Sequence, residues 1–106
     1  MKQYAVIIDL LEYRDFQRRH EDVAALETCL RGLTPRRPNL LQRASDGLLF
    51  SYAMETDAGA ESLVTAISAC PAYREADQIL VLEIGADVAG SGRWAMLIRD
   101  LLDGRK

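Results

Sequence analysis

Hydrophobic and polar residues follow two different spacings along this chain. The stretch Gln3–Leu11 is almost continuously apolar and rich in β-branched residues, which predicts a central strand buried on both faces. Apolar residues then recur every three or four positions, which predicts a helix at about Arg18–Arg31. Gly32 is expected to cap this helix, and Pro35 prevents its continuation. The first third of the chain is therefore predicted to be a strand followed by a helix.

A hairpin is predicted in the middle of the chain. The short stretch Asn39–Ala44 and the run Leu48–Met54 flank an Asp-Gly pair at positions 46 and 47, which is typical of a tight turn. In the second run, large apolar groups occupy the even positions, whereas Ser51 and Ala53 are small. We therefore expect the even positions to face the helices and the two small residues to face the other side of the sheet.

The last part of the chain predicts a helix, a strand and a final helix. The second helix is expected at about Ala58–Ala69, with Thr56–Asp57 as its N-terminal cap. Gln78–Ile84 is a second strongly apolar stretch of strand length. After a segment rich in glycine, apolar residues at helical spacing predict an amphipathic helix over about Trp94–Asp103.

This order of elements predicts an α+β fold, a ferredoxin-like βαββαβ sandwich with an additional C-terminal helix, in a single domain over residues 1–106. Both main helices are expected on one face of a four-stranded antiparallel sheet, which leaves the other face uncovered. Such a face is normally covered by a terminal helix or a second subunit. We therefore expect a homodimer, with Trp94 and Leu97 of the final helix as interface residues.

Composition supports one compact domain and limits the chemistry. The chain has 106 residues, 49% of them hydrophobic and 27% charged, as is usual for a globular domain. Neither a secretion signal nor a membrane-spanning stretch is evident, so we expect a soluble, cytoplasmic protein with no membrane partner. Cys29 and Cys70 stand 41 positions apart and the chain has one histidine, so no zinc-ligand or redox spacing exists. Both cysteines are expected in the core.

Charge is unevenly distributed along the chain. The net charge is −3, which argues against nucleic-acid binding driven by bulk electrostatics. Residues 1–45 nevertheless hold 8 Lys and Arg against 6 Asp and Glu, whereas residues 46–106 hold 5 against 10. This asymmetry allows one basic, nucleic-acid-binding patch, although arginines spread over a chain usually solvate several faces. The arginines of the candidate patch are Arg14, Arg18, Arg19, Arg36, Arg37 and Arg43.

Asp9 is the most prominent candidate for chemistry, because it is a carboxylate at the end of an otherwise apolar strand. Carboxylate oxygens suit Mg²⁺ or Mn²⁺, and two copies of Asp9 from a symmetric dimer could share one ion. The structural alternative is an ion pair with Arg14, Arg18 or Arg19 in the segment that follows. Both interpretations remain open at this stage.

A family resemblance is carried by two short stretches. Tyr4–Leu10 is an apolar strand with Asp9 near its end, and Asp77–Gly85 is an Asp-led final strand. Between them stand Phe50, Thr56 and a short helix. Over about residues 3–90, the chain resembles the small ferredoxin-like CRISPR-associated nucleases and their SinR-like and VapD-like relatives. The resemblance implies a homodimer in which two Asp9 carboxylates face each other, bind a divalent metal and support phosphodiester cleavage.

Three classes of function follow from these features. The leading hypothesis is a small homodimer that acts through nucleic-acid or protein contacts. Any enzymatic activity would be that of a metal-dependent nuclease, but a non-catalytic role is favoured, because no Ser-His-Asp order, paired carboxylates or histidine cluster is evident. The first alternative is a protein-interaction module, such as an inhibitor or regulator from a mobile element, that uses the acidic second half. The second is a small-molecule-binding domain on the uncovered sheet face.

Overall fold

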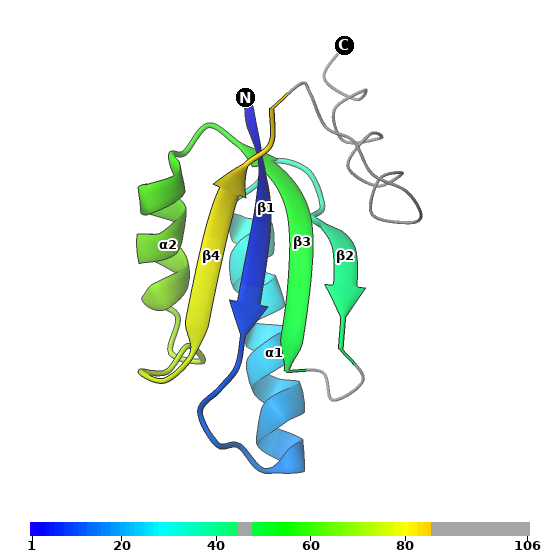
Figure 1. Cartoon of the computed structure of the whole chain (residues 1–106), viewed down its shortest axis with the longest axis vertical. Coiled ribbons are helices and arrows are strands. Elements are labelled where there is room, and N and C mark those ends of the chain that lie inside the picture. Colours follow the sequence, from blue (N-terminus) through cyan, green and yellow to red (C-terminus); the bar gives the residue numbers. More distant parts are fainter. Residues whose placement is uncertain (45–47, 86–106) are drawn as a thin grey trace.

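A computed structural model describes residues 1–44 and 48–85 of the chain (Figure 1). The predicted Asp-Gly turn and the predicted final helix, with Trp94 and Leu97, lie outside the described residues. Within them, six elements follow one another in the predicted order. They are β1 (Lys2–Asp9), α1 (Phe16–Gly32), β2 (Asn39–Arg43), β3 (Leu49–Thr56), α2 (Ala60–Ser68) and β4 (Gln78–Glu83).

The four strands form one antiparallel sheet in the order β2-β3-β1-β4. The central strand β1 pairs with β3 from Lys2 opposite Thr56 to Asp9 opposite Leu49. On its other side it pairs with β4, where Val6 lies opposite Val81. The two most apolar stretches of the sequence are therefore neighbours in the sheet. The predicted α+β class is confirmed, and the arrangement is compatible with a ferredoxin-like fold.

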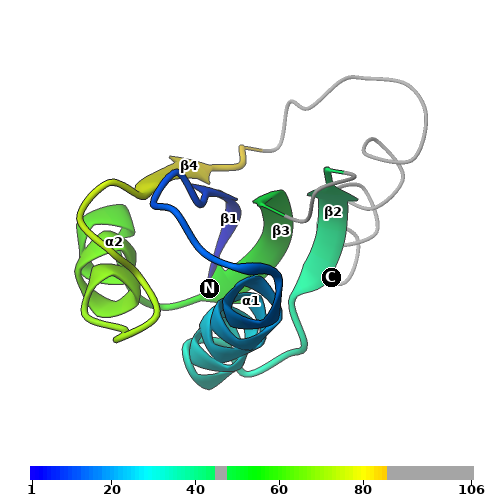
Figure 2. The ribbon, with the colours of Figure 1, turned by 90° about the horizontal axis from the view of Figure 1, so that it is seen from below.

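Both helices lie on the same face of the sheet, as predicted (Figure 2). The core fills the space between them, because every second residue of β1 and β3 points toward the helices. Large, fully buried side chains of the core come from two central strands and from both helices. They are Tyr4, Val6 and Ile8 of β1, Phe50 and Met54 of β3, Leu26 and Leu30 of α1, and Leu63 and Ile67 of α2.

The opposite face of the sheet is less completely buried. On this face of β1, Gln3 is buried and Ala5 and Ile7 are half-buried, so the prediction that the strand is buried on both faces holds fully for the helix side and in part for the other side. Ala53 does face away from the helices, as expected, and joins Leu41 in a small apolar cluster. On the edge strand β4, Leu80 and Leu82 remain 52% and 48% exposed. This face therefore presents apolar side chains that the two helices do not cover.

The ends of α1 differ slightly from the prediction. The helix begins at Phe16, because the Asp15 carboxylate accepts a hydrogen bond from the backbone N–H of Arg18 at 2.8 Å. Gly32 is the last helical residue, and Leu33 occupies the C-cap position in a right-handed conformation. The expectation that Gly32 is the cap was therefore wrong, because this end needs no left-handed residue.

The start of α2 was also predicted incorrectly. Thr56 is the last residue of β3, where it pairs with Lys2, so it is not available as a helix cap. Gly59 occupies the N-cap position, and no side chain caps the helix there. Of the described helices, neither has the length and apolar character that crossing a membrane requires.

Candidate functional site

A buried ion cluster joins the start of α1 to the segment before β4. The Arg14 side chain, in the link between β1 and α1, is 0% exposed, as is the side chain of Asp77. The two Nη atoms of Arg14 donate to the two carboxylate oxygens of Asp77 at 3.0 and 2.5 Å. Its Nε donates to Asp22 of α1 at 2.5 Å. The geometry is the bidentate fork that arginine forms with a carboxylate.

The remaining groups of this cluster are satisfied as well. The Nη atoms of Arg14 also donate to the backbone carbonyls of Glu12 and Ala72, so all five of its N–H groups have acceptors. Asp77 in turn accepts backbone N–H groups from Glu12 and Arg74 at 3.0 and 2.8 Å. The prediction that Arg14 belongs to a surface patch for nucleic acid is therefore corrected, because no part of its charge faces solvent.

The contacts within the cluster shift the pKa values of Arg14 and Asp77 in the directions that keep both side chains charged. Burial alone would raise the pKa of the Asp77 carboxyl, but the hydrogen bonds from Arg14 and from two backbone N–H groups outweigh it, so the pKa is lowered. The pKa of Arg14 is raised, chiefly by its hydrogen bonds to Asp77. Both groups therefore remain ionised across the physiological range. We assign this cluster a structural role.

Asp9 lies at the end of β1 on the sheet face opposite the helices, half-buried between Leu49 and Gln78. None of the three arginines expected as its partner pairs with it. Arg14 belongs to the buried cluster, Arg18 lies 3.4 Å from Glu21, and Arg19 donates to a backbone carbonyl. Among residues 1–44 and 48–85, no three His, Cys, Asp or Glu residues gather in a metal-binding group. Within the described part of one chain, Asp9 therefore belongs to no group of three or more such side chains.

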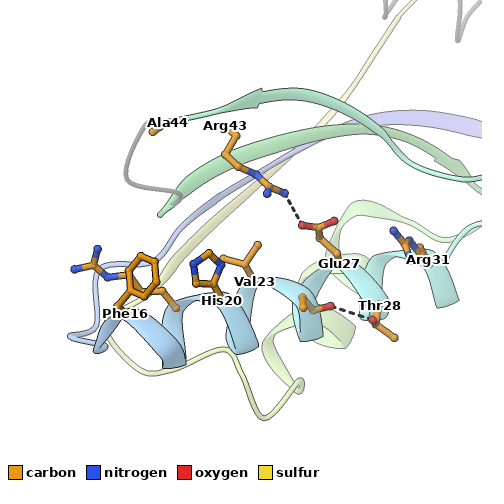
Figure 3. Close-up of a pocket in the computed structure, with 10 residues that line it drawn as sticks. Phe16, His20, Val23, Glu27, Thr28, Arg31, Arg43 and Ala44 are labelled. Carbon is orange, nitrogen blue, oxygen red and sulfur yellow. Dashed lines mark hydrogen bonds and ion pairs between the residues drawn. The ribbon is translucent and has the colours of Figure 1, made fainter.

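Arginine side chains gather instead along the side of the molecule where α1 faces β2. Three adjoining hollows of about 550, 450 and 390 Å³ follow α1 and the α1–β2 link. Figure 3 shows the largest, with the labelled side chains of α1 on one wall and Arg43 of β2 on the other. Arg31 lines all three hollows. We call this surface the arginine groove. Its arginines are Arg19, Arg31, Arg36, Arg37 and Arg43.

A polar contact between three elements fixes the wall of the arginine groove. Arg43 of β2 donates to Glu27 of α1 at 2.5 Å and to the Tyr52 hydroxyl of β3 at 3.3 Å. Burial, together with the nearby Glu27 carboxylate, raises the pKa of Tyr52 to about 12. Burial also disfavours the charge on Arg43, but the bonds to Tyr52 and Glu27 prevail, so its pKa is raised. The charge of Arg43 is therefore largely compensated within the protein.

Two other arginines of the groove carry a positive charge that no acidic side chain among the described residues pairs with. Arg31 and Arg37 are exposed, and neither forms an ion pair or side-chain hydrogen bond with another described residue. Arg36 differs, because its Nε lies 3.0 Å from the buried Glu55 carboxylate. Five arginines thus face two glutamates here, so the groove is locally cationic although the whole chain is acidic.

The structure sorts the arginines that were predicted to bind nucleic acid. Four of them line the groove, Arg18 lies outside it, and Arg14 is buried. The four are Arg19, Arg36, Arg37 and Arg43. Arg31 was missed, although a signal was present. Positions 19, 23, 27 and 31 are four residues apart and so share one face of α1. Recognising that this face borders the groove required knowing that β2 lies beside it.

An exposed aromatic side chain lies at the start of α1. Phe16 is 73% exposed and borders the largest hollow. Its ring meets the ring of His20 edge to face, with the centroids 4.6 Å apart. His20 is exposed, as expected from its polar surroundings in the sequence. The two rings and the neighbouring Val23 make this end of the groove less polar than the end at Arg31 and Arg37.

The two cysteines are free and half-buried, packed against the main core as expected. Burial raises the pKa of the Cys29 thiol, and the nearby Cys70 thiol adds to this shift. The two residues come from facing surfaces of α1 and the end of α2, where Cys29 Sγ also lies 3.9 Å from the carbonyl of Ala66. The Cys29 thiol is therefore not activated as a nucleophile.

Comparisons with protein-family models, with curated proteins and with solved structures found no match. The resemblance to the CRISPR-associated and SinR-like nucleases therefore stays a hypothesis. The arginine groove is the surface whose residues and contacts best support a function.

Proposed function

We propose that this chain is a ferredoxin-like protein that binds nucleic acid through the arginine groove. The observation that carries the proposal is the exposure of Arg31 and Arg37, whose charges meet no described acidic partner. An exposed guanidinium without a carboxylate is well suited to a phosphate, because its planar N–H groups can donate in pairs. The strand order β2-β3-β1-β4 and the two helices on one face support the ferredoxin-like part of the proposal.

The acidic net charge does not argue against this function, because dissolved salt screens a phosphate in the groove from acidic side chains that lie far from it. At physiological ionic strength, charges more than about 8 Å apart are largely screened from one another. A phosphate in the groove therefore interacts mainly with Arg31, Arg37 and their neighbours. We expect binding of moderate affinity with a strong dependence on salt, as for other contacts dominated by phosphates.

Arg31→Gln tests the proposal directly. The substitution removes one uncompensated charge at the position common to all three hollows. We expect weaker binding of a labelled nucleic acid at low salt and a decrease of about one in the slope of log K against log salt. Fluorescence anisotropy at several salt concentrations measures both quantities.

Arg18→Gln is the matched control, because Arg18 is an exposed arginine of the same helix that lies outside the groove. It should leave both the affinity and the salt slope close to those of the unmodified protein. Equal losses in the two variants would mean that diffuse charge rather than the groove attracts the ligand. Absence of binding at low salt would contradict the proposed function itself.

The proposal includes a homodimer, supported by the exposed Leu80 and Leu82 on the sheet face opposite the helices. Asp9 lies on the same face, so two copies of this face would bring the two carboxylates to one interface. If the two Asp9 carboxylates meet at this interface, they could share one Mg²⁺ or Mn²⁺ ion and support cleavage of phosphodiesters. A Mn²⁺-dependent cleavage that survives in Asp9→Ala would exclude this role for Asp9.

A protein-interaction module without enzymatic activity is the second candidate, and a specific observation favours it. Four of the six exposed acids of the described residues, Asp57, Glu61, Glu75 and Glu83, lie between the end of β3 and the end of β4, outside the lining of the arginine groove. The other two, Asp15 and Glu21, belong to the start of α1. The first four acids suit a basic protein partner. The two candidates differ in the first experiment, because only the first predicts that Arg31→Gln weakens binding of nucleic acid.

A further inference from the structure

The arginine groove changes character along its length. At the end near Arg31 and Arg37 it presents uncompensated positive charge. At the end near Phe16 its lining includes the apolar side chains of Val23 and Ala24. Figure 3 shows the rings of Phe16 and His20 beside one another at this end, on the same helix as Arg31. A ligand that fills the groove must therefore combine anionic groups with flat or apolar groups.

The distance between the two ends suits a short stretch of polymer. Phe16 and Arg31 are fifteen positions apart in one straight helix, which corresponds to about 22 Å along its axis. A mononucleotide cannot span this distance. A strand of several nucleotides can place its phosphates near the arginines and still present a base to the ring of Phe16.

Phe16 is positioned to receive such a base. Its side chain is 73% exposed, and the edge-to-face contact with His20 restricts the orientation of the ring. Bases stack on aromatic faces only when they are unpaired, because in a duplex their own faces are covered by neighbouring bases. Duplexes can offer the groove their phosphates but no free base. The exposed ring therefore adds affinity for single strands alone.

We propose, on the basis of the function proposed above, that the ligand is a single-stranded nucleic acid and that one of its bases stacks on Phe16. The arginines supply contacts that any polyanion can use, whereas Phe16 selects unpaired strands. The proposal assigns Phe16 a role in binding that its place at the start of a helix did not indicate. RNA and DNA single strands both offer phosphates and unpaired bases, so binding of either strand supports the inference.

The test compares a labelled single strand of about 12 nucleotides, as RNA and as DNA, with a hairpin duplex of the same composition whose loop is a non-nucleotide linker, so that the hairpin has no unpaired base. We expect the unmodified protein to bind the single strand more tightly than the hairpin. Phe16→Ala should weaken single-strand binding about 5- to 150-fold, the usual effect of losing one stacked base. It should leave hairpin binding and the salt slope unchanged. Phe16→Trp should retain the preference for single strands.

Tyr13→Ala is the matched control, because Tyr13 is 85% exposed and does not line the groove. It should bind both ligands like the unmodified protein. The inference is overturned if Phe16→Ala and Tyr13→Ala have the same effect, or if the hairpin binds as tightly as the single strand. These outcomes are distinguishable from failure of the groove itself, since Arg31→Gln would then still weaken binding. If neither ligand binds at low salt, both proposals fail.

Discussion

Arg14 shows how a residue's surroundings, rather than its type, decide its role. In the sequence it stands in a polar segment between a strand and a helix, where arginine is usually solvated. In the structure, every N–H of its guanidinium has an acceptor, and its main partner, Asp77, is 63 positions away. Because a buried charge is costly unless it is fully paired, the cluster is sensitive to the loss of any one member.

Asp77→Asn is expected to destabilise the fold by about 3 kcal/mol or more. The substitution keeps the shape of the side chain but leaves the buried Arg14 with one carboxylate partner instead of two. Urea unfolding at neutral pH measures the change. Asp57→Asn is the matched control, because Asp57 is 87% exposed, and it should change stability by less than about 0.5 kcal/mol. Similar effects in the two variants would mean that the cluster contributes little.

The same carboxylate makes stability depend on acidity. Because the pKa of Asp77 is lowered in the folded state, folded protein keeps this group ionised where an unfolded chain has already bound a proton. The contribution of Asp77 is therefore complete above about pH 4 and is lost as the pH falls through its lowered pKa. Asp77→Asn should show a smaller loss of stability than the unmodified protein over this acidic range, in the same unfolding measurement.

At the scale of elements, α1 is tied to the sheet by polar as well as apolar contacts. Leu26 and Leu30 are buried in the core, and Glu27 on the adjoining face bonds Arg43 of β2. Tyr52 of β3 completes this contact through its hydroxyl. These three residues link β2 and β3 to α1 at the wall of the arginine groove, in addition to the backbone pairing of β2 with β3.

Alkaline pH should weaken this contact. The pKa of Tyr52 is raised to about 12, so the folded state retains the phenolic proton at a pH where an unfolded chain releases it. Stability from this group is therefore complete below about pH 10 and falls as the pH approaches 12, by roughly 2 kcal/mol in total. Unfolding in urea across this range, together with phenolate absorbance, measures the effect.

Tyr52→Phe is the variant that isolates this contribution. It should be less stable near neutral pH, because Arg43 loses an acceptor, but its stability should fall less between pH 10 and pH 12. Some alkaline dependence should remain, since burial also raises the pKa of Tyr73. An unchanged slope in Tyr52→Phe would assign the alkaline effect to other groups.

The elements themselves were largely predictable, because strand and helix periodicities are local properties of the sequence. Predictions failed where a contact between distant residues decided the outcome. Thr56 extends β3 instead of capping α2, because it pairs with Lys2 near the N-terminus. Arg31 was missed as part of the candidate site for a similar reason. It lines the groove because β2 lies beside the face of α1 that carries it in the fold.

At the scale of the whole molecule, the described residues place different groups on different surfaces. Exposed arginines lie along α1, the α1–β2 link and β2, most exposed acids lie between the end of β3 and the end of β4, and Leu80 and Leu82 lie on the sheet face away from both helices. These three surfaces are compatible with simultaneous use. A second copy on the leucine-bearing face would leave both arginine grooves open, so a dimer would present two binding sites to one strand.

Leu82→Glu is expected to shift the protein from dimer to monomer. Leu82 is 48% exposed at the edge of the sheet, beside Ala5 of β1, and a carboxylate there would be costly to bury against a second copy. Sedimentation velocity at several concentrations measures the change in mass. Because the side chain is half exposed in one chain, the substitution should leave the circular dichroism spectrum of the fold unchanged.

Leu11→Glu is the matched control for the dimer. Leu11 is 53% exposed but lies beyond the end of β1, outside the sheet. It should leave the mass of the dimer unchanged. If both variants and the unmodified protein sediment as monomers at all concentrations, the sheet face is not a dimer interface, and Asp9 has no second carboxylate with which to share a metal ion. The arginine groove would be unaffected by that result, because every residue that forms it comes from one chain.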